Sequence, residues 1–69
     1  MGMIHFVNIY RRQRGSAEEY RFLLAETSAS GGQALAQAGR IVDALRREFA
    51  DYEFVIVRGA ASLRDGSEG

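Results

Sequence analysis

The chain has 69 residues and no Cys, so it forms one domain at most and cannot be held together by a disulfide or a thiolate metal site. Its nine basic residues are all Arg and are balanced by nine acidic residues, which argues against strong non-specific binding to nucleic acid phosphates. No apolar run approaches the ~20 residues that cross a bilayer, so we expect no membrane segment and a soluble cytoplasmic protein.

The first predicted strand runs from about Met3 to Arg11. Its apolar side chains fall on both alternating sets, which is typical of a strand that is buried on both faces at the centre of a sheet. The polar run at 11–17 contains Gly15 and predicts a hairpin connection. A second strand, from about Glu19 to Thr27, is then expected to pair with the first.

The second segment has an alternative interpretation as a helix. Ser16 and Glu19 match a capping box, and Tyr20, Leu23 and Leu24 follow at helical spacing. The alternation around Tyr20 favours a strand, because the first strand would otherwise have no near neighbour in the sequence. A helix over 16–28 remains the alternative.

A helix is predicted over 33–50, where apolar residues recur at intervals of three and four and form an amphipathic stripe. Ser30 and Gln33 form a capping box at its start. Small residues on the apolar stripe, Ala34 and Ala38, predict a close approach of the helix to the sheet.

The last predicted strand runs from Tyr52 to Arg58. The residues after it are small and polar, which is typical of a mobile terminus. The sequence therefore predicts a single domain over 1–58 and a flexible polar tail over 59–69.

These elements predict an α+β fold of ββαβ order, with a three-stranded antiparallel sheet in strand order 2-1-3 and one amphipathic helix on one face. Because a single helix covers only one face of a sheet, the other face is left for the chain's own tail, a second copy of the chain or another molecule. Strands ~18 Å long would expose roughly 250 Å² there, whereas a standard interface buries about 800 Å² per partner. We therefore expect the hairpin to enlarge the contact.

Six of the seven aromatic residues stand at even positions, so those within one strand share a face. Alignment between strands depends on the register, which the sequence does not determine. We expect these rings to pack under the helix, and the alternative is an exposed aromatic face. The six are Phe6, Tyr10, Tyr20, Phe22, Tyr52 and Phe54.

The sequence contains no recognisable catalytic, cofactor-binding or metal-binding set. His5 is the only His, and Glu18 and Glu19 are neighbours that do not converge as an acid–base pair. We therefore expect a non-enzymatic protein that binds a protein partner, a second copy of itself, or both. The expected partner-binding residues lie in and around the hairpin: Arg11, Arg12, Arg14, Tyr10 and Tyr20.

The same hairpin supports an alternative function as a small RNA- or DNA-binding domain. In that case the Arg side chains would hold phosphates while the Tyr rings stack on exposed bases.

In size and build alone, the Tyr10–Phe22 hairpin followed by a helix and a strand resembles the compact inhibitors of phages, among them the anti-CRISPR proteins. This resemblance implies an inhibitor or adaptor from a phage or mobile element. It assigns no functional residue in this chain.

Overall fold

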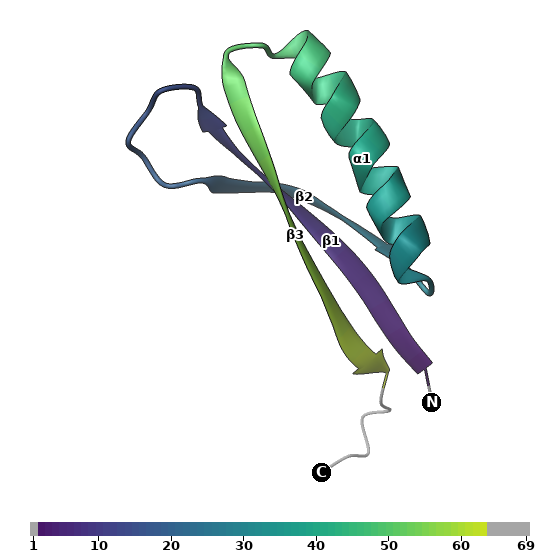
Figure 1. Cartoon of the computed structure of the whole chain (residues 1–69). Coiled ribbons are helices and arrows are strands. Elements are labelled where there is room, and N and C mark those ends of the chain that lie inside the picture. The colour runs from purple at the N-terminus through teal and green to yellow at the C-terminus, as the bar shows by residue number, and fades with distance from the viewer. Residues whose placement is uncertain (1, 64–69) are drawn as a thin grey trace.

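A computed structural model describes residues 2–63, which form three strands and one helix (Figure 1). The strands make one antiparallel sheet in the order β2-β1-β3. The predicted α+β fold, with the most apolar strand in the centre, is therefore confirmed. The elements are β1 (Gly2–Gln13), β2 (Arg21–Ser28), α1 (Gly31–Glu48) and β3 (Tyr52–Leu63).

The central strand β1 pairs along its length with β3, so that Gly2 lies opposite Leu63 and Gln13 opposite Tyr52. The sequence prediction ended the third strand at Arg58, five residues too early. Residues 59–63 have small or polar side chains that suggest a tail, but they pair with the first part of β1. The remainder of the predicted tail, 64–69, lies outside the described residues.

The strand β2 carries an irregularity in its pairing with β1. Ile9 lies opposite Leu24 and Tyr10 lies opposite Phe22, which leaves Leu23 as the extra residue of a β-bulge. Leu23 and Leu24 both pack against the core, although they are neighbours in sequence. The alternative helix over 16–28 is wrong: β2 is a strand, and its bulge lets two consecutive, half-buried Leu residues pack against the core.

The helix α1 begins at the predicted cap. The Ser30 hydroxyl oxygen accepts a hydrogen bond from the Gln33 N–H at 3.3 Å. The return contact of the capping box runs through Ser28, because Ser30 N–H donates to Ser28 Oγ and that hydroxyl donates to Gln33 Oε1, both at 3.2 Å. The start of the helix is thereby tied to the end of β2.

The core lies between α1 and one face of the sheet. Small Ala side chains one helical turn apart let the helix approach the strands closely, as the sequence predicts. No described element covers the opposite face of the sheet. The buried residues are Val7, Ile9, Ala34, Ala38, Val42 and Phe54.

Candidate binding surface

The sheet face that points away from α1 is not covered by any described element, and we call it the open face. Strand register places residues on it because directly opposite residues of an antiparallel pair share a face. From β1 it has Ile4, Phe6, Asn8, Tyr10 and Arg12; from β2, Phe22, Ala25 and Thr27; from β3, Glu53, Val55, Val57, Gly59 and Ala61.

Apolar side chains form the middle of the open face. Tyr10 lies between Phe22 of β2 and Val55 of β3. The Tyr10 and Phe22 rings meet edge to face, with their centroids 5.7 Å apart. Phe22 is 57% exposed and Val57 is 49% exposed, so this region offers apolar surface to a partner.

Phe6 lies across Gly59, its cross-strand neighbour. A Cβ atom added at Gly59 would come within 2.3 Å of Phe6 Cζ, which is closer than real carbon atoms approach each other. Any side chain at this position would therefore displace the Phe6 ring. The absence of a side chain at Gly59 makes this part of the face flat.

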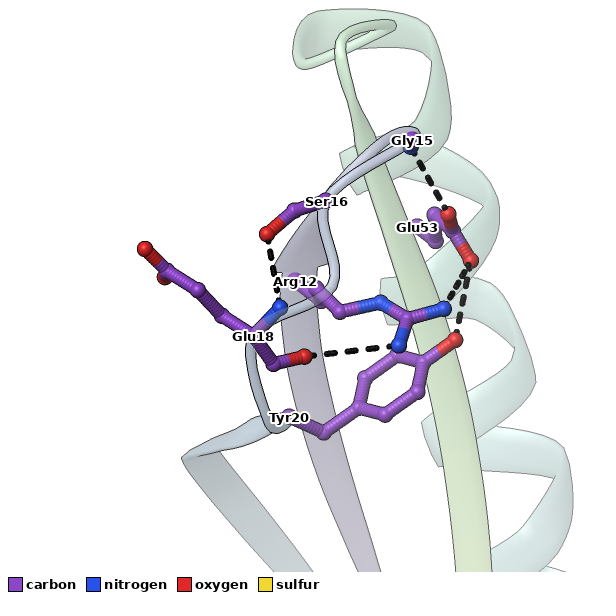
Figure 2. A network of polar contacts seen from close by, with 6 residues as sticks. All are labelled: Arg12, Gly15, Ser16, Glu18, Tyr20 and Glu53. Carbon is purple, nitrogen blue, oxygen red and sulfur yellow. Dashed lines mark hydrogen bonds and ion pairs between the residues drawn. The ribbon is translucent and has the colours of Figure 1, made fainter.

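A polar cluster closes the open face at the hairpin end (Figure 2). Glu53 accepts hydrogen bonds from the Tyr20 hydroxyl at 2.9 Å, from Gly15 N–H at 3.3 Å and from Arg12 Nη2 at 3.4 Å. The Arg12 guanidinium lies 4.3 Å from the centroid of the Tyr20 ring and donates through Nη1 to the Glu18 carbonyl oxygen. This cluster joins the hairpin loop to β3.

The cluster shifts the pKa values of its two titratable partners in opposite directions. The hydrogen bond from Tyr20, followed by the one from Gly15 N–H, lowers the pKa of Glu53 below its ordinary value. The hydrogen bond to the Glu53 carboxylate raises the pKa of Tyr20, because losing the proton would remove that bond. Neutral phenol and ionised carboxylate therefore stabilise each other.

The open face carries no net charge among the residues assigned to it. Arg12 and Glu53 are its two charged residues, and they form an ion pair with each other. Arg58 and Arg11 belong to the opposite face by register. An uncharged, largely apolar surface fits a partner surface of the same character.

Three of the five expected partner-binding residues come together on or beside the open face. Tyr10 lies in its apolar centre, and Arg12 and Tyr20 belong to the polar cluster. Arg14 lies in the hairpin loop, where its main-chain N–H donates to Asp51 O at 2.7 Å and its Nε donates to Ala50 O at 3.2 Å.

The fifth expected residue, Arg11, faces the helix side of the sheet. Its guanidinium lies 5.4 Å from the centroid of the Tyr52 ring. It also lines a groove of about 310 Å³ between the end of α1 and the sheet. The hairpin Arg residues are thus divided between two surfaces, because consecutive residues of a strand point to opposite faces.

The aromatic residues are also divided between the two faces. Tyr52 and Phe54 lie on the helix side, as expected, and Phe54 is buried in the core. The expectation that the aromatic rings pack under the helix is wrong for the other four, which lie on or beside the open face: Phe6, Tyr10, Tyr20 and Phe22.

Sequence reasoning did not single out Glu53, Val57 or Phe22 as site residues. Glu53 is the second residue of the third predicted strand, but its proximity to Arg12 depends on a register that connects distant parts of the chain. For Phe22, the bulge at Leu23 decides which face the ring occupies. Neither the β1–β3 register nor the position of the bulge can be inferred from one segment of the sequence alone.

Within residues 2–63, no group of three or more acidic or His side chains is arranged to hold a metal ion. No helix in that range has the length and apolar character needed to cross a membrane. Comparison of the chain with protein-family models, with curated proteins and with solved structures finds no match.

Proposed function

We propose that the chain is a small non-enzymatic module that binds another protein through the open face. The observation that carries this proposal is the combination of exposed Phe22 and Val57 with an internally neutralised pair of charges. An exposed apolar patch bordered by polar residues is the usual character of a protein–protein contact. Tyr10 supplies an aromatic side chain with a polar tip at the centre of this patch.

The area of the open face is large enough to contribute to binding but is smaller than the area that a standard interface buries on one partner. The strands contain 12, 8 and 12 residues, which gives roughly 500 Å² of flat sheet at about 3.4 Å per residue and 4.8 Å per strand. This is about twice the area expected from the sequence. A standard interface buries about 800 Å² on each side, so the polar cluster of the hairpin has to join the contact.

A chain of this size acts most simply by covering a surface of its partner, as an inhibitor or an adaptor does. We propose that the chain is encoded by a phage or mobile element and acts in this way in the cytoplasm. Arg12 and Tyr20 border the apolar patch, and Arg14 lies in the adjoining loop. These three residues are proposed to contact polar groups at the rim of the partner surface.

Photo-crosslinking tests the proposal and does not require that the partner be identified first. Phe22 is replaced by p-benzoylphenylalanine, which keeps an aromatic ring at an exposed position of the open face. The matched control carries the same residue at Arg40, which is exposed on α1. We expect protein adducts in host cells from position 22 and none from position 40. Equal adducts from both positions, or none from position 22, would contradict the proposal.

A second candidate function is binding of single-stranded RNA or DNA, and the observation that favours it is the presence of Tyr10 and Phe22 on an exposed sheet face. Bases stack on such rings in several single-strand-binding folds. The two charges assigned to the open face neutralise each other, however, so that among the described residues of this face no cation is left for phosphates. The test is binding of a single-stranded probe at ~50 mM salt. Binding that weakens as salt is added and is lost in Phe22→Ala would show that the partner is a nucleic acid and not a protein.

A further inference from the structure

The two outer strands of the sheet differ in how their free edges are protected. β2 has 8 residues and contains the bulge at Leu23. β3 has 12 residues and pairs with β1 without any register shift. Each of the two strands contains two charged residues, and neither contains Pro or Lys. Short length and bulges are among the devices that prevent a free edge from pairing with another strand, and β3 has neither.

One hydrogen bond determines which residues of β3 direct their main-chain groups away from β1. Arg14 N–H donates to Asp51 O at 2.7 Å, so these opposite residues form a hydrogen-bonded pair. Such pairs alternate with non-hydrogen-bonded pairs along an antiparallel ladder. Odd-numbered residues of β3 therefore bond to β1. Even-numbered residues direct N–H and C=O groups outward: Phe54, Ile56, Arg58, Ala60 and Ser62.

We infer that the chain forms a symmetric dimer in which β3 pairs antiparallel with β3 of a second copy, about a two-fold axis at Val57. No described strand pairs with this edge of β3 (Figure 1). Opposite residues must share a face, so only registers that pair odd with odd and even with even are allowed. The axis at Val57 lets residues 52–62 overlap and pairs two half-exposed Val side chains.

Charge decides between this register and the next possible one. An axis at Arg58 would allow the same overlap but would place Arg58 directly opposite the partner's Arg58, which is unfavourable. With the axis at Val57, Arg58 lies opposite the partner's Ile56. The aliphatic part of the Arg58 side chain can then cover an apolar neighbour.

The dimer satisfies the free backbone groups without a clash between helices. The even-numbered residues can form up to about ten main-chain hydrogen bonds across the axis, which is the number in a typical interface. α1 packs mainly over β1, so the two helices would be separated by three strand spacings, about 14 Å. Packed helices approach to 8–10 Å, and these two would remain clear of each other.

Pairing of β3 also joins the two open faces into one surface. The combined flat area is roughly 1,000 Å², which exceeds the ~800 Å² per partner of a standard interface. The dimer itself rests on the β3 edge and not on the proposed function. It can therefore be tested with the purified chain alone.

Charge exchange at position 57 tests the two-fold axis. Wild-type protein at increasing concentration should pass from 7.6 kDa to about twice that mass by light scattering. Val57→Lys and Val57→Glu each place like charges across the axis, and each should raise the dissociation constant roughly tenfold or more. An equimolar mixture of the two variants should restore the dimer, because opposite charges then meet.

Two further variants distinguish edge pairing from other arrangements. Ala60→Pro removes an outward N–H while sparing the bonds to β1, and it should give a folded monomer by circular dichroism and mass. Phe22→Lys changes the open face far from the β3 edge and should leave the dimer intact. A wild-type chain that stays at 7.6 kDa up to ~1 mM would overturn the inference. So would a dimer that Phe22→Lys abolishes, because the open faces would then pack together instead.

Discussion

Glu53 joins β3 to the β1–β2 connection at the hairpin end of the sheet. Its carboxylate accepts hydrogen bonds from Tyr20, from Gly15 N–H and from Arg12, all of which lie in or beside the β1–β2 connection. The lowered pKa of Glu53 means that the ionised form is favoured in the folded protein. Its ionisation is therefore linked to the stability of the hairpin.

We expect this link to appear as acid sensitivity. A group whose pKa is lower in the folded state adds stability above its ordinary pKa, here 4.5, and loses it as the pH falls through the folded value. The melting temperature of the wild type should therefore exceed that of Glu53→Gln at pH 7, and the difference should shrink below about pH 4.5. Thermal melts monitored by circular dichroism at pH 7, 5, 4 and 3 measure this difference.

The control for this experiment is Glu19→Gln, which changes an exposed acid of the same loop outside the cluster. The melting temperature of Glu19→Gln should remain close to that of the wild type at every pH. The Tyr20 hydroxyl provides an independent readout, because its raised pKa depends first on Glu53. Ring-carbon NMR shifts should show Tyr20 losing its proton at lower pH in Glu53→Gln. An unchanged Tyr20 titration would contradict the hydrogen bond.

Individual residues show where prediction from sequence reaches its limit. Tyr10 and Arg12 were predicted as contact residues and lie on the open face, whereas Arg11 lies on the opposite face. Glu53 was not predicted. These outcomes depend on strand register, which is fixed by packing between segments that are distant in the sequence. Local residue types carry no direct information about it.

At the scale of the elements, local patterns predicted more. The apolar period of α1 and the cap at Ser30 depend on residues within a few positions of each other, and both were predicted. The end of β3 depends instead on its partner: residues 59–63 have weak strand preference and become a strand because β1 extends beside them. The strand β2 was predicted from its alternation, but its bulge was not.

The cap at Ser30 should contribute measurably to stability because it satisfies a free N–H at the start of α1. We expect Ser30→Ala to lower the free energy of unfolding by about 1 kcal/mol. For a chain of this size that corresponds to a melting temperature lower by about 4–8 °C. Urea denaturation and thermal melts measure the two quantities independently.

Ser30→Asp is the matched control for the cap. Asp accepts the same hydrogen bond from Gln33 N–H and interacts favourably with the helix dipole, so stability should remain close to that of the wild type. Equal destabilisation in the Ala and Asp variants would contradict the role of the Ser30 side chain as a cap, because both variants keep the main-chain N–H that donates to Ser28.

The whole molecule is elongated for its length. The Cα radius of gyration is 14.5 Å, whereas a compact domain of this size is expected near 11 Å. The long β1–β3 pair accounts for the shape, since it extends beyond the start of α1 at the end where the described chain begins (Figure 1). Among residues 2–63, six apolar side chains are buried, so much of the sheet contributes surface without contributing core.

A small core beside a long free edge makes association a natural source of additional stability. The β3 edge offers hydrogen bonds to a second copy, and the open face offers apolar area to another protein. The proposed dimer uses the outward main-chain groups of β3, whereas the proposed protein contact uses side chains of the open face, and Val57 lies where the two surfaces meet. The two contacts can therefore coexist in one assembly. Edge pairing also places both open faces on the same side, where they can bind one partner together.

If the chain dimerises through β3, its melting temperature must depend on its concentration, because the dimer binds only the folded state. Above the dissociation constant, each tenfold increase in concentration should raise the melting temperature by about 3–6 °C. In Val57→Lys the rise in melting temperature should begin only at a concentration roughly tenfold or more above that of the wild type, while the melt remains cooperative. Scanning calorimetry at several concentrations measures both proteins. A wild-type melting temperature that is independent of concentration would show that the free edge of β3 adds no stability through self-association.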